Sequence, residues 1–247
     1  MDLLQRFYPE SRFGGYADAD GTLAFYTRIQ SMIASDTVVL DVGCGRGAGA
    51  DDPVRARREA RRFKGRARHV IGIDVDPAAA TNSLIDEFRH IGAERWPIDE
   101  ASIDLVVVDN VLEHIANPDD FFGNVRRVLR KRGCICLRTP NVWGYVALAS
   151  RLVPNRLHAR LLSRAQKQRH EADVFPTVYR CNSIPALRRM LRSHGFDAVV
   201  YGYEAQPSYL DFSKALYGLG VLHQKLAPGF LKPALFAFGQ LCDSEGA

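Results

Sequence analysis

Two carboxylates and a group of glycines are, by type and spacing, the residues best suited to hold a ligand. The stretch LDVGCGRG (residues 40–47) lies at the end of a short apolar run, and a second apolar run ends at Asp74. Glycines let a backbone approach a ligand closely, and the first N–H groups of a following helix have no partner within that helix. A dinucleotide would require the pattern G-x-G-x-x-G/A, which Gly43, Gly45 and Ala48 satisfy only loosely.

Two classes of cofactor use such a turn, dinucleotides and cationic ligands without phosphate, and Asp41 distinguishes between them. A carboxylate two residues before the first glycine would repel the pyrophosphate of a dinucleotide, but it would attract a cation. S-adenosylmethionine (SAM) is such a ligand, because it carries an ammonium and a sulfonium and no phosphate. Asp74 ends the next apolar run, where a carboxylate can accept hydrogen bonds from both hydroxyls of a ribose. The pair therefore favours SAM and argues against a NAD-dependent oxidoreductase.

Two histidines have the chemistry of a general base, which transfer of a group to a neutral hydroxyl requires. His114 follows the apolar run 103–109 within the segment NVLEH, and packing or capping of the next helix is the alternative role. His170 opens a polar segment, residues 170–180, which either lines an acceptor pocket or forms a surface loop. Carboxylates follow His170, but no second histidine lies at helical spacing, so the sequence predicts no metal site.

The elements that must position these groups alternate between strands and helices. Continuous apolar runs predict buried parallel strands at residues 37–43, 69–74, 103–109 and 134–138. Helices are predicted at residues 21–34, at 118–132 with Gly133 as the stop, and at 183–194. Strands at 196–203 and 233–241, with an apolar helix or helix pair at 209–226 between them, would complete the sheet. Strands separated by helices indicate a parallel sheet covered on both faces.

Positive charge is concentrated in two stretches. The chain of 247 residues has 33 Lys and Arg against 28 Asp and Glu, a formal net charge of +5. Residues 53–69 contain eight Lys or Arg and one Glu, and residues 151–170 contain six and no acid. Such runs attract phosphates or an anionic membrane face, and a solvated helix face is the alternative.

Composition excludes several classes of protein. With 47% hydrophobic and 25% charged residues, the chain is neither disordered nor of low complexity. It has no apolar run long enough to span a membrane, and its first residues do not read as a secretory signal. Its five cysteines include no C-x-x-C pair, which indicates a reducing compartment, and a cytoplasmic location is predicted.

The motifs, taken in order, resemble those of class I SAM-dependent methyltransferases. The segments that show the resemblance are VLDVGCGRG, VIGIDVDP and WPIDEASIDLVVVDNVLEHIANPDDFF, followed by VLRKRGCICLRTPN. The set closest in pattern is the small-molecule group with an LEH segment after strand four, and the resemblance covers residues 36–140. It implies an α/β fold with a doubly wound, mostly parallel, seven-stranded Rossmann-like sheet and helices on both faces.

The resemblance also implies an organisation within a single methyltransferase domain, residues 1–247. Residues 1–35 would form an N-terminal helical cap, and residues 36–140 the SAM-binding core. A helical insertion after strand five, residues 141–182, would serve as a lid over the acceptor. Residues 183–247 would complete the sheet with a helix and strands.

The family pattern assigns roles to individual positions. The cofactor-binding set that it implies is Asp41, Gly43 and Gly45 at the methionine part of SAM, Asp74 at the ribose, Val75 at the adenine, and Asp109 and Asn110 near the methyl group. The acceptor set is Tyr179, Arg180 and Arg12, with His114 or His170 as catalytic base. Gly92 stands where the family often has an acidic residue for the adenine amino group, so how adenine is held stays open.

The expected activity is methyl transfer from SAM to a hydroxyl of a small molecule or glycan, as a step of biosynthesis. The basic stretches favour an anionic acceptor, and the apolar tail at 209–241 suits a lipid-linked acceptor and peripheral membrane contact. N-methylation of an amine metabolite and a non-catalytic, SAM-binding regulatory role are the alternatives. A nucleic-acid substrate is disfavoured, because the chain has Asp109-Asn-Val-Leu where a D/N-P-P-Y/F motif would stand. The acceptor and the oligomeric state stay open.

Overall fold

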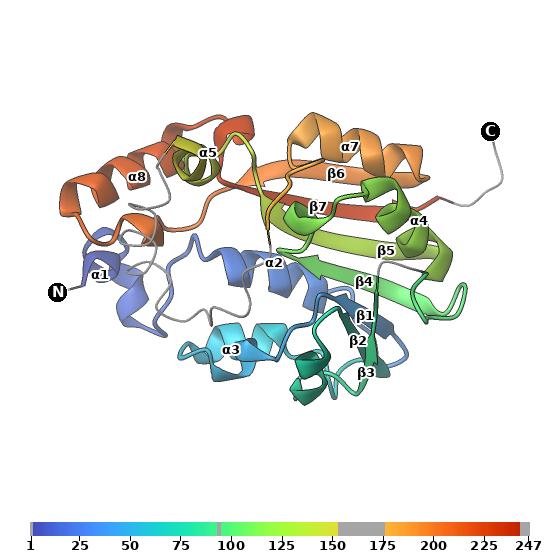
Figure 1. The fold of residues 1–247 in the computed structure, drawn as a ribbon. Helices are drawn as coiled ribbons and strands as arrows, with labels where there is room; N and C mark the ends of the chain where they lie inside the picture. The colour runs from blue at the N-terminus through green and yellow to red at the C-terminus, as the bar shows by residue number, and fades with distance from the viewer. Residues whose placement is uncertain (1, 93–94, 153–175, 243–247) are drawn as a thin grey trace.

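A seven-stranded sheet organises the chain, in the order β3-β2-β1-β4-β5-β7-β6. The computed structural model describes residues 2–92, 95–152 and 176–242, without the side chains of 149–152. The strands are β1 (Val38–Val42), β2 (His69–Asp74), β3 (Glu87–His90), β4 (Ile103–Asp109), β5 (Leu129–Pro140), β6 (Phe196–Tyr203) and β7 (Ala234–Leu241). All neighbours pair in parallel except β7, which runs antiparallel to β5 and β6 (Figure 1). The predicted doubly wound, mostly parallel sheet is confirmed.

Helices cover both faces of the sheet and one of its ends. α2 (Gly21–Gln30) and α3 (Arg55–Arg61) belong to one face, and α4 (Pro118–Val128) and α7 (Ile184–Ser193) to the other. α1 (Leu3–Phe7), α5 (Tyr145–Leu152) and α8 (Lys214–Leu226) lie beyond the carboxyl ends of the parallel strands, on the left in Figure 1. The sheet edge on which the predicted site residues converge therefore faces these three helices.

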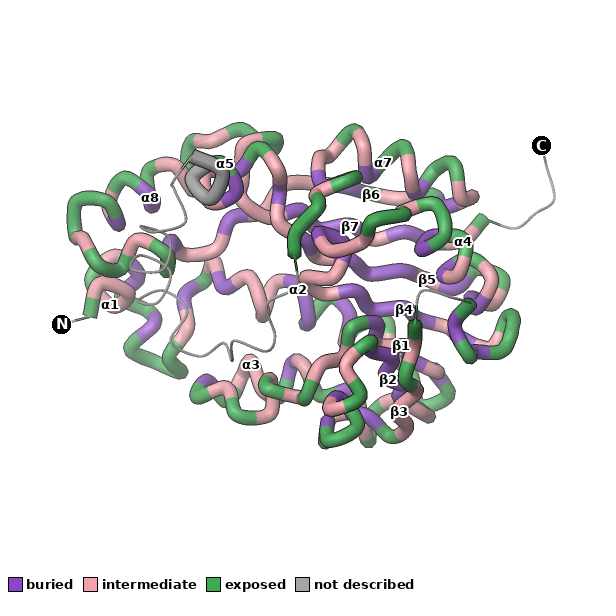
Figure 2. The backbone as a smooth tube through the Cα atoms, in the orientation of Figure 1, coloured by how far each residue is buried: buried purple, intermediate pink, exposed green. Residues whose placement is uncertain are grey.

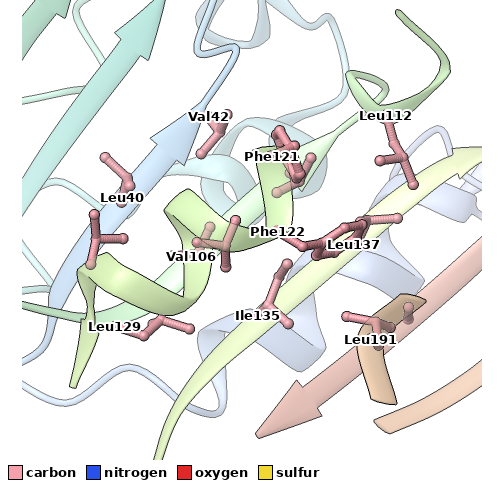
Figure 3. Packing of buried hydrophobic residues seen from close by; sticks show 14 of the residues in the cluster. Leu40, Val42, Val106, Leu112, Phe121, Phe122, Leu129, Ile135, Leu137 and Leu191 are labelled. Carbon is pink, nitrogen blue, oxygen red and sulfur yellow. The ribbon is translucent and has the colours of Figure 1, made fainter. Parts of the chain in front are cut away.

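Both faces of the central strands are buried, as the continuous apolar runs predict. Successive side chains of a strand point to opposite faces, and Val39 and Leu40 are both fully buried, in the two separate hydrophobic clusters. Figure 3 shows Phe121 and Phe122 of α4 lying against Leu137 and its neighbours on the sheet. The strands form the purple centre of Figure 2. This rigid layer fixes where the polar strand ends stand.

The helix predicted at 118–132 ends earlier, at Val128, so the prediction that Gly133 stops it was wrong. β5 begins at Leu129, which pairs with Ile103 before a shift in register. A Cβ at Gly133 would come within 2.9 Å of the Arg130 carbonyl oxygen, so glycine is required by close backbone packing inside the strand. β3 was not predicted, because this short edge strand, EFRH, has no continuous apolar run.

The basic run 53–69 is only in part a solvated surface. Arg57 of α3 donates to Asp20 at 2.7 Å, and this carboxylate also caps α2 through the N–H groups of its first turn. Arg61 pairs with Asp52 at 2.7 Å and lies over the ring of Tyr26. Two of the arginines therefore fasten α3 to α2.

Candidate functional site

The turn after β1 is built for close approach of a ligand. Gly43, Gly45 and Gly47 all have positive φ angles, 68°, 54° and 80°, which side chains rarely adopt. A Cβ at Gly43 would collide with Val111, and one at Gly47 with Asn82, so these two glycines are packed against the protein. A Cβ at Gly45 would meet no atom of the described residues within 4 Å. The backbone at Gly45 is therefore the open wall of the turn.

Asp41 lies beside this wall with an unbalanced negative charge. Its carboxylate has no hydrogen-bond partner among the described residues, and burial raises its pKa to about 7, with added repulsion from Asp109 and Asp74. A cation held there would remove the repulsion and favour the ionised form. The ammonium of SAM would be such a cation, and the open backbone at Gly45 would border its methionine part; both roles stay predictions.

Asp74 shapes the same turn from the end of β2. Its carboxylate accepts from the Gly45 N–H at 2.8 Å and from the Asp76 N–H at 2.9 Å, one bond to each oxygen. Since a carboxylate oxygen has two lone pairs, each oxygen retains one accepting position, which a ribose hydroxyl would use. Val75 follows with 50% of its surface exposed, as an apolar contact for adenine would require. The roles of both residues stay predictions.

Asp109 is placed at the predicted strand end, but its carboxylate is occupied by the protein itself. Arg138 of β5 binds both oxygens, and Tyr26 donates to one at 2.9 Å while the Asn110 side chain donates to the other at 2.9 Å. Four donors fill the accepting capacity of a carboxylate. A cofactor contact at this position would therefore come from backbone or from Asn110, whose φ of 55° is unusual for a residue other than glycine.

Arg138 is the site residue that the sequence reasoning missed. It is nearly buried, its pKa is raised by Asp109, and its guanidinium lies 5.3 Å from the Phe25 ring centre and 5.8 Å from that of Tyr26. The available signal was a single arginine within the apolar strand CICLRTP, next to a strand that ends in aspartate. A charge in a buried strand requires a partner.

His114 lies in a 3-10 turn (Leu112–His114) that follows β4 at the sheet edge. Its Nδ1 lies 3.0 Å from the carbonyl oxygen of Pro176, and its Nε2 lies 3.9 Å from a carboxylate oxygen of Glu113. A carbonyl only accepts, so Nδ1 donates this hydrogen bond, and in the neutral form of the ring the lone pair would then lie on Nε2. This tautomer is the one that lets Nε2 take a proton.

A buried polar chain continues from Glu113 into the sheet. Its carboxylate accepts from the Thr139 hydroxyl at 3.0 Å, and that hydroxyl accepts from the Asn182 side chain at 2.6 Å. Burial raises the pKa of Glu113, while the nearby His114 opposes the rise. These bonds link the 3-10 turn after β4, β5 and the residue before the N-cap of α7, and they hold Glu113 beside the imidazole.

The other predicted acceptor residues are brought together only in part. Residues 176–180 dock on the same turn, where the N–H groups of Val178 and Tyr179 donate to the Glu113 carbonyl. Arg180 follows on the surface, and Arg12 is exposed in the 3-10 helix Pro9–Arg12 near the N-terminus. His170 lies outside the described residues. Gly92, which stands at the family's position for holding the adenine amino group, is exposed.

Two negative findings concern the described part of the chain only. Within it, no group of three or more His, Cys, Asp or Glu side chains could hold a metal ion. No helix among the same residues has the length and apolarity needed to cross a membrane.

Comparison with known proteins finds a family that matches part of the chain. Residues 40–137 match the family described as a methyltransferase domain. A protein of Mycolicibacterium smegmatis described as a probable SAM-dependent methyltransferase is 35% identical over 107 residues, which cover 42% of this chain and 38% of that protein. The ubiquinone biosynthesis O-methyltransferase of Maricaulis maris is 30% identical over 112 residues, 42% of this chain and 40% of that protein.

The fold extends further than the sequence similarity. A SAM-dependent methyltransferase from Archaeoglobus fulgidus superposes with a TM-score of 0.54 over 95% of this chain and 99% of that one, at 17% identity. The chain thus shares the whole fold with a solved methyltransferase, whereas it matches less than half the length of its curated relatives.

Proposed function

We propose that this chain, which contains a class I SAM-dependent methyltransferase domain, transfers a methyl group to a hydroxyl of a small molecule or glycan. The observation that carries the choice of a hydroxyl is the tautomer of His114, whose Nδ1 donates to a carbonyl oxygen. SAM supplies an electrophilic methyl group on a sulfonium when it is bound. The protein then has to hold the cofactor, orient the acceptor and accept one proton.

His114 would accept that proton. During methyl transfer, the hydroxyl proton of the acceptor would pass to Nε2 of His114. Glu113, with a carboxylate oxygen 3.9 Å away, would stabilise the imidazolium. A base of this kind contributes roughly 100- to 10,000-fold to the rate. His170 is the second candidate for this role.

The acceptor is proposed to be anionic or lipid-linked and to lie against residues 141–182 and the N-terminal cap. Arg12 and Arg180 would supply positive charge, and Tyr179 a phenol, on that side. The basic stretches at 53–69 and 151–170 support an anionic acceptor. The name of the Maricaulis relative supports a hydroxyl on a small molecule. A cytoplasmic location, a role in biosynthesis and the single-domain division stay predictions.

The experiment supplies SAM with a labelled methyl group to pools of hydroxyl-bearing and amine-bearing acceptors. With the acceptor identified, His114→Ala should lower kcat at least tenfold and leave the Kd for SAM within about threefold. Glu113→Gln should shift the pH profile of kcat while SAM binding stays intact. If amines take the label, and if the His114→Ala and His170→Ala variants keep the full kcat across the pH range, N-methylation replaces this proposal. Tight SAM binding without any labelled product would favour a regulatory protein.

A further inference from the structure

We propose that one face of α8, together with the loop after it, is a surface that docks the protein on an anionic lipid membrane. The α8 surface consists of six large apolar side chains that are 40–73% exposed: Phe212, Leu216, Leu219, Leu222, Leu226 and Phe230. They lie within 19 residues of the chain, whereas the rest of the described residues contribute eight such side chains. A cluster of this kind marks an interaction site.

The leucines of the α8 surface share one side of the helix. At 3.6 residues per turn, the four leucines fall within an arc of about 120°. The opposite side packs on the N-terminal helix, where the rings of Tyr217 and Phe7 lie 5.2 Å apart and Val221 is buried in the same cluster. Figure 2 shows exposed residues recurring along α8. Among the described residues, packing within the fold therefore accounts for one side of the helix, and the leucine side stays exposed.

The fold holds this helix firmly. Ser213 caps its N-terminus, and His223 binds the buried carboxylate of Glu204 at 2.8 Å. Gln224 accepts from the Tyr8 hydroxyl at 2.6 Å. The leucines are thus presented by a fixed element and not by a fraying end.

The loop that carries Phe230 is held from below. The fully buried side chain of Asn141 donates to the carbonyl oxygens of Phe230 and Lys232, both at 2.8 Å. The ring of Phe230 remains 57% exposed above this anchor. An aromatic ring held out of the core by a buried amide suits insertion into an apolar phase.

Exposed lysines favour an anionic interface as the occupant of the α8 surface. Lys214 and Lys225 are exposed near the two ends of α8, and Asp211 is the only acid in residues 205–233. Lys225 and Lys232 also line a pocket with Glu10, Asp18 and Glu204, which offset part of this positive charge. Leucine and phenylalanine on one side with lysines at the flanks are the pattern of a helix that lies in a membrane interface. A second copy of the chain would bring the same lysines face to face, which opposes dimerisation there.

The dimensions fit peripheral contact. Thirteen residues of α8 extend about 20 Å, too short to span the hydrocarbon core of a bilayer, so the helix would lie in the plane of the interface. α8 stands beyond the carboxyl ends of the parallel strands, the side that also holds the candidate site (Figure 1). Docking there would bring the site close to a membrane-borne acceptor, and this consequence alone rests on the proposed function.

The test is co-sedimentation of the full chain with vesicles, without any acceptor. The protein should bind vesicles of phosphatidylcholine mixed with phosphatidylglycerol, bind phosphatidylcholine alone more weakly, and lose affinity as salt rises. Leu219→Gln combined with Leu226→Gln should weaken binding at least tenfold. Lys214→Gln combined with Lys225→Gln should lower affinity for the mixed vesicles about fivefold for each lysine. Val199→Gln, at a 65% exposed position on the edge strand β6, is the matched control and should bind normally.

Circular dichroism and thermal unfolding of each variant separate loss of docking from loss of fold. The proposal is overturned if the wild-type chain binds neither vesicle, or if the leucine variant binds like the wild type. It is also overturned if light scattering finds a wild-type dimer that the leucine variant converts to a monomer. Vesicle binding that depends on the leucines, in a chain that methylates no acceptor, would uphold docking and reject the proposed function.

Discussion

At the scale of single residues, the carboxylate of Asp41 dominates the electrostatics of the site. It stands at the end of β1 beside the open backbone of Gly45, with the carboxylates of Asp74 and Asp109 nearby. Arg138 and Tyr26 lie in this region too, where Nε and Nη2 of Arg138 and the Tyr26 hydroxyl donate to Asp109. Of the three carboxylates, Asp41 is therefore the one with no hydrogen-bond donor among the described residues, and the consequences can be measured by changing pH.

Asp41→Asn should stabilise the cofactor-free protein at neutral and alkaline pH. Folding raises the pKa of Asp41 to about 7 from an ordinary value of 3.8, so the folded state holds a proton that the unfolded state has lost. The wild type therefore loses stability as pH rises from about 4 to 7, and the loss is complete above 7. Thermal unfolding should show that the Tm of the variant exceeds the Tm of the wild type by a margin that grows over this pH range. The margin should be ~2–4 °C for each kcal/mol of difference in the free energy of unfolding.

A Tm difference independent of pH would contradict the assignment. Asp76→Asn is the control, since the pKa of Asp76 is lowered, chiefly by the N–H of Ala78 and by Arg46. Because folding lowers the pKa of Asp76, its ionised form stabilises the folded state, and Asp76→Asn should cost stability at neutral pH. That cost should disappear as pH falls below the ordinary carboxyl pKa.

SAM affinity should depend on the same ionisation. Only ionised Asp41 attracts the ammonium, so the Kd for SAM should fall as pH rises from 6 to 8 and then level off. Titration calorimetry in buffers of different ionisation enthalpy should detect proton release on binding near pH 6. Asp41→Asn should bind roughly ten- to hundredfold more weakly, because a charge-assisted bond contributes about 1.5–3 kcal/mol, and its Kd should no longer vary with pH. Equal pH dependence in both proteins would place the ammonium elsewhere.

At the scale of elements, α3 shows how one basic run divides into structural and solvated arginines. Arg57 pairs with Asp20, which is 2% exposed and caps α2, and Arg61 packs on Tyr26. Arg55, Arg62 and Arg68 are exposed. Arg57 and Arg61 support α2, the helix from which Tyr26 donates to Asp109. Among the described residues, the side chains of the three exposed arginines make no such contact.

Replacing Arg55, Arg62 and Arg68 together by Gln should leave the Kd for SAM within about threefold and the Tm nearly unchanged, because exposed charges contribute little. Arg57→Gln should instead lower the Tm by several degrees, since it leaves the buried carboxylate of Asp20 with backbone donors alone. Calorimetry and thermal unfolding of the two variants test this division. A large loss of SAM affinity in the triple variant would show that the basic run reaches the cofactor.

At the scale of the whole molecule, the fold divides into a rigid sheet and a smaller helical cap. The two largest hydrophobic clusters of the described residues lie on either face of the sheet, while α1 and α8 share a third with only four buried members. Local stability follows the amount of buried apolar contact. The cap that borders the candidate site is therefore expected to open more readily than the sheet.

Hydrogen exchange should resolve this difference. Amides of α1 and α8 should exchange at least tenfold faster than those of the central strands β4 and β5, a difference of about 1.4 kcal/mol in opening free energy. Added SAM should slow amide exchange at residues 43–47 and 74–76. It should leave the exchange rates of α7, which packs on the sheet beside α4, unchanged. Protection that appears in α7 but not in the glycine turn would contradict the proposed cofactor site.

Much of the fold and the cofactor side of the site could be predicted from the sequence. β2, β4 and β6 have the predicted bounds, because each is a mostly apolar segment between turn residues. The glycine turn and the carboxylates at the strand ends follow from short-range order in the chain. β3 and the true end of α4 could not be predicted, because pairing with a neighbouring strand decided both.

The sequence by itself therefore determined the parallel sheet, the glycine turn after β1 and the presence of Asp41 and Asp74 at neighbouring strand ends. Tertiary structure alone decided which of the carboxylates keep a free accepting position. Asp109 loses its accepting positions to Tyr26, 83 residues earlier in the chain, and to Arg138, 29 residues later. Tertiary packing also decided which side of α8 is left exposed. The reason is physical: hydrogen-bond saturation and burial depend on distances between segments that only the folded chain brings together.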